Sequence, residues 1–271
     1  MDNPYDINIG FIYFDHSSNS LAMLHLLKNK TFMLFFIGNI TSLIGFGFNL
    51  IAISWMVLEE SGSEYLLGKI MASATAPGLI LAIFAGVIID KVNRKWLLVF
   101  LDIFRMLVVI GFLYFISKNQ FELSILYPVA FFMGLGNSLF WPTAQAFVQE
   151  LVSEKVYFDA NKLLSASYQV GSILGAGIGG LIVHAFSPVA ALWINILTYL
   201  VSAMFISLAP FKRKKVNTED KSLYDSIMKG FLYLKRRADV LILGLTTILS
   251  DVAIWGSLSV LTITISKEIF Q

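Results

Sequence analysis

Residues 86–95 read Gly86-Val-Ile-Ile-Asp90-Lys91-Val-Asn-Arg94-Lys95, with one carboxylate and three basic side chains between two long apolar runs. A charged side chain is unfavourable in hydrocarbon, so this segment predicts a water-exposed turn between two membrane-spanning helices. Lys and Arg accumulate in cytoplasmic loops. The excess of basic residues therefore predicts that the turn lies on the cytoplasmic side.

The composition of the whole chain indicates a membrane protein. Hydrophobic residues make up 57% of the chain and charged residues 14%, whereas roughly 25% of residues are charged in soluble domains. Seven apolar runs have the length of about 20 residues that a helix needs to cross the bilayer. They lack the strict alternation of barrel strands, so we expect an all-α, polytopic fold. The expected spans are Phe32 to Leu58, Tyr65 to Ile89, Trp96 to Ile116, Leu123 to Val148, Leu163 to Phe186, Val189 to Ala209 and Val240 to Ile265.

The basic residues are distributed unequally between the two sides of these spans. Most of the 20 Lys and Arg residues fall on the side where the chain begins, and the first loop on the other side carries Glu59, Glu60 and Glu64. This asymmetry predicts a multi-pass protein of the cell membrane with a cytoplasmic N-terminus. The net charge of +2 conceals the asymmetry and gives no indication of nucleic-acid binding. The partner expected for these bases is the lipid bilayer.

Changes in composition divide the chain into four segments. Residues 1–30 have acids and no early basic region, so we expect a cytoplasmic tail rather than a secretory signal, with Met23 as an alternative start. Residues 31–210 are the expected six-helix bundle. Residues 211–238 begin as a basic linker and continue with apolar residues at helical spacing, which predicts an amphipathic helix on the inner leaflet. Residues 239–271 are the expected seventh transmembrane helix, the start of a truncated second bundle.

The sequence disfavours several kinds of chemistry. The chain has no Cys, and its 3 His residues are scattered, so we expect no disulfide and no metal site. It has no P-loop, no G-x-S-x-G motif and no HExxH motif. The run from Gly175 to Gly180 formally fits a dinucleotide-binding pattern, but it lies in a membrane span and follows no strand. We therefore expect neither a cofactor nor an enzyme.

Residues 86–95 also carry a family resemblance. They are similar to the loop signature G-x-x-x-D-[RK]-x-x-[RG]-[RK] of major facilitator superfamily transporters, in which this loop joins the second and third helices. The resemblance covers the chain from Leu27 to its end, and it implies the N-terminal six-helix half of such a transporter with its seventh helix. Segments such as Ser42 to Gly45 resemble the branch of macrolide efflux proteins and siderophore exporters. The residues that match the signature are Gly86, Asp90, Lys91, Arg94 and Lys95.

The resemblance implies a secondary active transporter that rocks two bundles about a central site. Its branch implies efflux of amphiphilic small molecules, either drugs, macrolide-like compounds or siderophores, with protons as the coupling ion. Ala176 stands where the superfamily's antiporter signature has Pro, which weakens the argument for antiport. Because such a transporter needs a second bundle, the alternative is an incomplete, non-transporting membrane fragment or a half-bundle partner protein.

The resemblance also implies that Asp90 acts in gating. In the family, the loop acid is thought to pair with bases and to cap a helix of the opposite bundle, which latches the outward-open state. A carboxylate at a helix N-terminus contributes roughly 0.3 to 1 kcal/mol when exposed, a scale that suits a contact that forms and breaks. The alternative is that Asp90 and its neighbours only fix the topology.

Three charged residues are expected within the membrane. Asp102 and Arg105 stand three residues apart on one helical face. They either pair with each other or couple their helix to the Asp90 loop. Asp251 is the one acid deep in the seventh span, and an intramembrane acid is a candidate proton carrier or cation ligand. Alternatively, Asp251 meets a base on another helix, or it is neutral and hydrogen-bonded.

Two further sets of residues are expected to shape the bundle. Glycines at four-residue spacing in the fifth span should allow a neighbouring helix to approach closely. Aromatic and amide side chains near the middle of the bundle should line a cavity that suits amphiphilic compounds better than sugars, although a Phe-rich bundle core would look similar. The packing glycines are Gly171, Gly175, Gly179 and Gly180. The candidate cavity residues are Asn39, Asn49, Asn137, Trp141 and Gln145.

Overall fold

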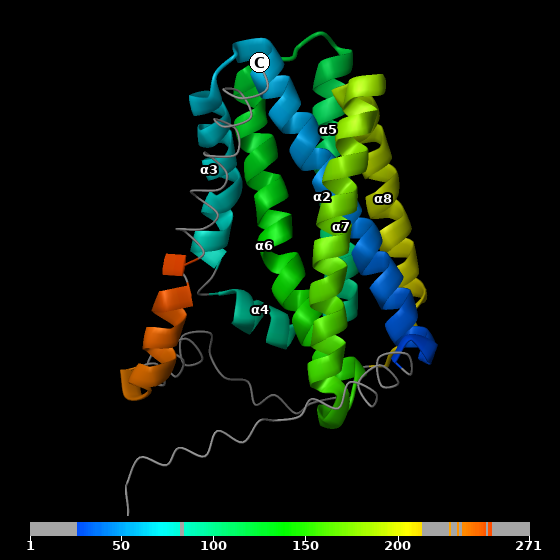
Figure 1. Ribbon diagram of the computed structural model, residues 1–271, viewed down its shortest axis with the longest axis vertical. Coiled ribbons are helices and arrows are strands. Elements are labelled where there is room, and N and C mark those ends of the chain that lie inside the picture. Colours follow the sequence, from blue (N-terminus) through cyan, green and yellow to red (C-terminus); the bar gives the residue numbers. More distant parts are fainter. Residues whose placement is uncertain are drawn as a thin grey trace, which may run out of the picture. The chain divides into compact units, whose positions relative to one another are not determined.

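The computed structural model describes residues 26–81, 84–212, 228, 232, 235–247 and 249–250. Within these residues all regular structure is helical, which confirms the predicted all-α fold. The chain divides into two units, Met1–Lys215 and Val216–Gln271. Helices of the first unit, labelled as in Figure 1, are α2 (Lys30–Ser61), α3 (Glu64–Leu81), α4 (Ala85–Lys91), α5 (Arg94–Ser117), α6 (Leu126–Leu151), α7 (Tyr157–Ala185) and α8 (Pro188–Leu208).

Five of these helices, α2, α5, α6, α7 and α8, are long and apolar enough to cross a membrane. The helices α3 and α4 pass the same test only as a pair, and they are bent by 65° relative to each other. The sequence predicts a single span from Tyr65 to Ile89, whereas the structure divides this run into two helices. The apolar run continues past the end of α3, so its length and composition do not reveal a change of direction.

Local sequence accounts for several helix ends. Asn29 precedes α2, and its side chain accepts hydrogen bonds from the backbone N–H groups of the second and third residues after it. Gly62 follows α2 with φ of 60°, a left-handed conformation that glycine adopts without strain. Ser187 caps α8 in the same way as Asn29, and Pro188 occupies the first turn, where it removes no helical hydrogen bond. These caps satisfy backbone groups that a helix end leaves unpaired.

The helices pack in an order that differs from their order in the sequence. The helix α2 lies against α7 and α8, α5 lies against α6 and α8, and α3 lies against α6 (Figure 1). By contrast, α2 and α3 pack only loosely although they are consecutive, and so do α6 and α7. The sparse packing between α6 and α7 leaves room for the cavity described below.

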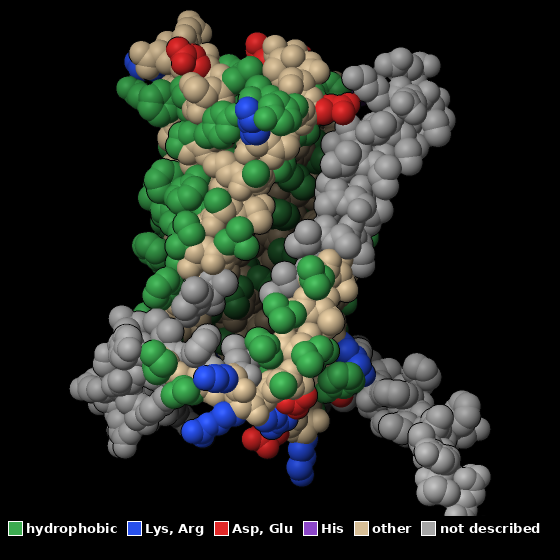
Figure 2. All heavy atoms as spheres, turned by 90° about the vertical axis from the view of Figure 1, so that its left-hand side faces the viewer, with side chains coloured by type: hydrophobic (Ala, Val, Ile, Leu, Met, Phe, Trp, Pro, Cys, Tyr) green, Lys and Arg blue, Asp and Glu red, His purple; other side chains and the backbone are tan. Residues whose placement is uncertain are grey.

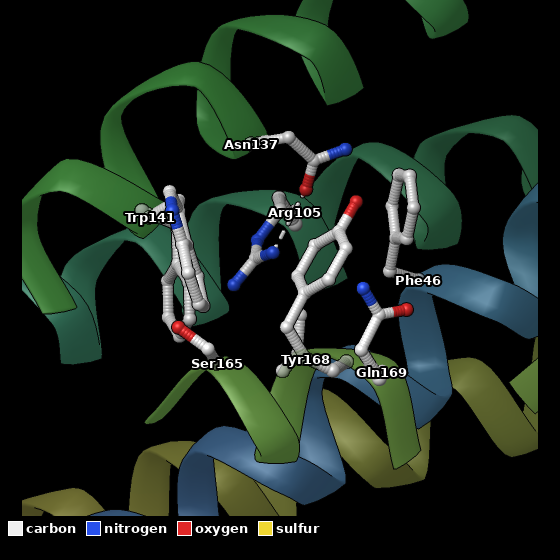
Figure 3. A pocket seen from close by; sticks show the side chains of 9 residues that line it. Phe46, Arg105, Asn137, Trp141, Ser165, Tyr168 and Gln169 are labelled. Carbon is white, nitrogen blue, oxygen red and sulfur yellow. Dashed lines mark hydrogen bonds between the residues drawn. The ribbon is translucent and has the colours of Figure 1, made fainter. Parts of the chain in front are cut away.

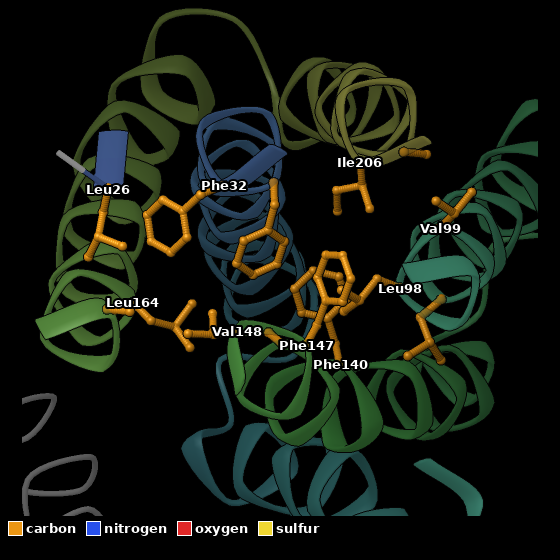
Figure 4. Packing of buried hydrophobic residues seen from close by; sticks show 14 residues of the cluster. Leu26, Phe32, Leu98, Val99, Phe140, Phe147, Val148, Leu164 and Ile206 are labelled. Carbon is orange, nitrogen blue, oxygen red and sulfur yellow. The ribbon is translucent and has the colours of Figure 1, made fainter. Parts of the chain in front are cut away.

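A buried hydrophobic cluster joins five helices at the end of the bundle where α2, α5 and α7 begin. Figure 4 shows Phe32 of α2, Leu98 of α5, Phe147 of α6, Leu164 of α7 and Ile206 of α8 meeting there. Each of these side chains is at most 1% exposed. Because lipid is as apolar as the cluster, close packing rather than removal from water favours this contact within a bilayer.

The outside of the bundle is apolar between its ends. Large hydrophobic side chains, including Phe100, Leu107, Leu181 and Trp193, are exposed there. Figure 2 shows hydrophobic and uncharged side chains along one side of the bundle, with acidic and basic side chains at its upper end. Such a surface suits contact with lipid, and it confirms the prediction of a multi-pass membrane protein.

The second unit is described only in part. An apolar helix spans Ala238–Thr247, and Arg237 forms an exposed ion pair with Asp239 at 2.8 Å. The expected seventh span from residue 239 to residue 271 lies mostly outside the described residues, as does Asp251. The predicted limits of the tail, the linker and this span therefore stay predictions.

Candidate functional site

An ion pair lies in the interior of the bundle. Asp102 and Arg105 stand one turn apart on α5, and their side chains are 0% and 2% exposed. A nitrogen of the Arg105 guanidinium, Nη2, donates to Oδ1 of Asp102. The structure therefore shows the first of the two arrangements expected for these residues, in which they pair with each other.

Hydroxyl groups from two other helices complete the surroundings of Asp102. Ser42 of α2 donates to Oδ1 of Asp102 at 2.8 Å, and Ser202 of α8 donates to Oδ2 at 2.6 Å. Burying a carboxylate is unfavourable unless its oxygens are hydrogen-bonded and its charge is balanced. Both conditions are met here, so the pair fastens α5 to α2 and α8.

The guanidinium group of Arg105 is held on its faces and at its edge. The ring of Phe140 on α6 lies 4.2 Å from its central carbon, and the ring of Tyr199 on α8 lies 4.6 Å away. At its edge, Nη1 donates to Oδ1 of Asn137 on α6 at 2.8 Å. Cation–π contacts of this kind favour a cation that is withdrawn from water. Arg105 thus connects the ion pair to α6.

A cavity of about 440 Å³ lies beside Arg105, within the range of ordinary ligand pockets. Arg105, Asn137 and Trp141 line it on the side of α5 and α6 (Figure 3). Tyr168 of α7 faces them, and its ring centroid is 5.0 Å from that of Trp141. The remaining residues of the lining are Leu43, Phe46, Phe140, Ser165 and Gln169.

The structure brings together only some of the expected cavity residues. Asn137 and Trp141 line the cavity, whereas Asn49 lies with Asn137 at a smaller one of about 50 Å³. Asn39 is fully buried, and its amide donates to Ser167 of α7 at 2.8 Å, so it joins two helices instead. Gln145 is exposed and lies outside the lining. The expectation is therefore corrected for Asn39 and Gln145, because composition does not show which face of a helix points inward.

Three residues of α7 line the cavity without having been expected from the sequence. Tyr168 and Gln169 follow Ser165 by three and four residues in α7. Polar residues at this spacing share one helical face, but the spacing alone does not show that this face borders a cavity. Arg105 was expected as an intramembrane charge, and in the structure it also lines the cavity.

The charged loop forms a second cluster at the end of the bundle. Arg94 pairs with Asp90 at 2.9 Å and with Glu150 of α6 at 3.0 Å, and it also donates to the carbonyl of Ala146. The side chain of Asp90 is 70% exposed, whereas that of Arg94 is 14% exposed. Arg94 therefore anchors the loop to the end of α6, and Asp90 lies at the surface.

The two bases beside Arg94 differ in their surroundings. Lys95 is 7% exposed, and its Nζ donates to the carbonyls of Ser207 and Ala209 at the end of α8, both at 2.7 Å. A cation in this position satisfies carbonyls that the helix leaves unpaired and complements the helix dipole. Lys91 is exposed at the end of α4. Gly86 of α4 has open space on the side where a Cβ atom would lie.

Three of the four expected packing glycines lie against α2. A Cβ atom on Gly175 would lie 2.5 Å from the carbonyl oxygen of Ile44, and one on Gly171 would lie 2.5 Å from Cβ of Leu43. Gly179 similarly faces Phe48 at 2.9 Å. At Gly180, no atom of the described residues lies within 4 Å of that position. Its expected packing role is corrected, because it is one residue beyond Gly179 and faces away from α2.

These features define a class of protein: a multi-pass helical membrane protein with an ion pair and a cavity inside its bundle. Residues 21–266 match the family model described as transmembrane secretion effector, MFS_3. The chain therefore belongs to this family of the major facilitator superfamily, which confirms the resemblance inferred from the loop signature.

Several curated proteins are similar to the chain. The "Putative bacilysin exporter BacE" of Bacillus subtilis (strain 168) is 28% identical over 174 residues, which cover 64% of this chain and 43% of that protein. The protein of the same name from Bacillus amyloliquefaciens is 26% identical over 202 residues, or 74% of this chain and 50% of that protein. The multidrug efflux pump Tap of Mycolicibacterium fortuitum is 22% identical over 215 residues, or 76% and 51%. The chain thus spans about half the length of these relatives, which are transporters rather than enzymes.

Proposed function

We propose that the protein is a proton-coupled secondary exporter of amphiphilic small molecules in the cell membrane. The observation that carries this proposal is the cavity of about 440 Å³ between α2, α5, α6 and α7. Its lining combines aromatic rings with a few polar groups, Arg105 among them, a composition that suits molecules with an apolar body and one polar end. Relatives named as an exporter and as a multidrug efflux pump support export as the direction of transport.

The proposal assigns the charged loop to the cytoplasmic end and to gating. Lys28, Lys30, Lys155 and Lys162 lie at the same end of the bundle as Asp90, which supports a cytoplasmic N-terminus by the positive-inside rule. Arg94 holds the loop against α6, which leaves the exposed carboxylate of Asp90 in a position to cap a helix of a second bundle. Forming and breaking that contact would accompany the rocking of the two bundles.

The rest of the proposed organisation follows the sequence. Residues 1–30 form a cytoplasmic tail, residues 31–210 form the six-helix bundle, and residues 211–238 connect it to a seventh helix at 239–271. Asp251, within that proposed helix, is the proposed proton carrier, because an ionisable residue within a membrane span is a candidate for proton transfer.

The test is uptake of an amphiphilic dye into everted membrane vesicles that contain the protein produced from its complete gene. We expect uptake to require a proton gradient and to stop when a protonophore is added. Asp90→Asn should reduce uptake several-fold without changing the amount of protein in the membrane, because the amide keeps the shape but loses the charge. Glu154→Gln, an exposed position at the same end of the bundle, is the matched control and should transport normally.

The vesicle experiment tests export, proton coupling and the Asp90 latch separately. No uptake of any dye above that of empty vesicles would contradict export. Uptake that persists with the protonophore would contradict proton coupling alone, and full activity of Asp90→Asn would contradict the latch alone.

A further inference from the structure

The cavity has an asymmetric distribution of charge. Of the described residues that line it, Arg105 is the single charged one, and no carboxylate belongs to this lining. Asp102, which balances Arg105, is fully buried and accepts hydrogen bonds from Ser42 and Ser202, away from the lining. The ion pair is therefore a dipole with its positive end at the cavity.

Arg105 brings a charged donor group to this wall. A guanidinium group has five N–H groups. Within the described part of the chain, four of them are used: Nε donates to the Leu101 carbonyl, Nη2 donates to Asp102 and Ser42, and Nη1 donates once to Asn137. The fifth N–H is on Nη1, beside Asn137.

The amide of Asn137 adds a second donor. Arg105 can only donate, so the Asn137 atom at 2.8 Å from Nη1 is its oxygen, Oδ1. The NH₂ group of the amide consequently points away from Arg105, as Figure 3 shows. Both residues line the cavity, so its wall includes a charged donor group from Arg105 and an amide donor group from Asn137.

The aromatic residues of the lining suit an apolar ring. Trp141 and Tyr168 form a tilted pair with centroids 5.0 Å apart, and Phe46 and Phe140 also line the cavity. Flat aromatic groups pack well against such rings in offset or edge-to-face arrangements. The cavity therefore presents an aromatic part and, beside it, a positively charged donor part.

We infer that this cavity binds anionic amphiphiles, with the carboxylate or a similar acceptor at Arg105 and Asn137 and an aromatic body at Trp141 and Tyr168. The inference rests on the proposed function and adds the charge of the substrate to it. A cation of the same shape would lie near the positive end of the Asp102–Arg105 dipole, and its binding would be weaker for that reason.

The test compares three probes that share one aromatic body: 1-naphthoate, 1-naphthalenemethanol and 1-naphthylmethylammonium. Their dissociation constants are measured by equilibrium dialysis with the protein from the complete gene, in nanodiscs of zwitterionic lipid, with empty nanodiscs as background. We expect naphthoate to bind about tenfold more tightly than the ammonium probe, with the alcohol between them.

A second test adds a negative charge to the cavity lining through a substitution that hardly changes the size of the side chain. Gln169→Glu places a carboxylate in the lining, and we expect it to weaken naphthoate binding about tenfold and to strengthen binding of the ammonium probe. Gln149→Glu makes the same chemical change at an exposed position of α6 outside the lining, and it should leave all three constants unchanged.

The outcomes separate this inference from the proposed function. Tighter binding of the ammonium probe by the unaltered protein, or equal effects of the two Glu variants, would overturn the charge assignment while leaving export in place. If none of the three probes binds, both the inference and the role of the cavity in export are overturned.

Discussion

At the scale of single residues, the energetics of the bundle interior depend on the Asp102–Arg105 pair. Breaking a buried ion pair by removing one partner costs roughly 3–5 kcal/mol, because the remaining charge is left without compensation. Arg105→Met should therefore lower the melting temperature strongly. The double variant Asp102→Asn/Arg105→Met leaves no uncompensated charge, and we expect it to melt at a higher temperature than Arg105→Met. Differential scanning fluorimetry in detergent measures both.

The exposed pair between Arg237 and Asp239 provides the matched control for this prediction. Ion pairs in water contribute little to stability, so Arg237→Met should leave the melting temperature unchanged. If the double variant melts as early as Arg105→Met, the lost stability would belong to the contacts of Arg105 with Asn137, Phe140 and Tyr199 rather than to the charge of Asp102.

At the scale of helices, the crossing of α2 and α7 depends on glycines that face each other. A Cβ atom on Gly175 would meet backbone atoms, the Ile44 carbonyl oxygen at 2.5 Å and Cα of Gly47 at 3.0 Å. Backbone cannot move aside as a side chain can, so Gly175→Ala must separate the two helices. Overpacking of this kind typically costs about 1–3 kcal/mol, and we expect a clear drop in melting temperature.

Gly180→Ala is the matched comparison on the same helix. Its Cβ atom would occupy open space, and Ala favours a helix over Gly by about 1 kcal/mol. This variant should be as stable as the original protein or slightly more stable. Equal destabilisation by the two substitutions would mean that the crossing of α2 and α7 is not as close in the membrane as the structure shows.

At the scale of the whole molecule, the topology can be tested by labelling single introduced cysteines with a maleimide. The chain contains no Cys, so no native residue has to be replaced first. Lys155 and Glu60 are exposed at opposite ends of the bundle. We expect a membrane-impermeant maleimide to label Glu60→Cys in intact cells and Lys155→Cys only in everted vesicles. The unaltered chain should not be labelled at all, and the reverse pattern would contradict a cytoplasmic N-terminus.

The fold was more accessible to sequence reasoning than the candidate site. Run length and the absence of strand-like alternation are sufficient to predict helices in a membrane, because the bilayer leaves few other ways to satisfy the backbone. Site residues depend instead on which helical face points inward. Asn39 and Asn137 look alike in the sequence, yet one joins α2 to α7 while the other faces the cavity.

For the loop at residues 86–95, too, some properties could be predicted from the sequence and others could not. The spacing of its residues was sufficient to indicate the superfamily. Its charges were sufficient to place the loop at a helix end. The sequence did not reveal that Arg94 would reach Glu150, or that Lys95 would lie at the end of α8. Both contacts join segments that are more than fifty residues apart in the chain.

By itself, then, the sequence of this protein determined the helical class, the membrane environment, the superfamily and the presence of charges inside the bundle. These properties follow from composition and local spacing, which hydrocarbon constrains strongly. The tertiary structure alone decided the order of the helices, the bend between α3 and α4, and the meeting of Arg105, Asn137, Trp141 and Tyr168 at one cavity. The physical reason is that these features depend on contacts between helices distant in the chain, and such contacts leave no periodic trace in the sequence.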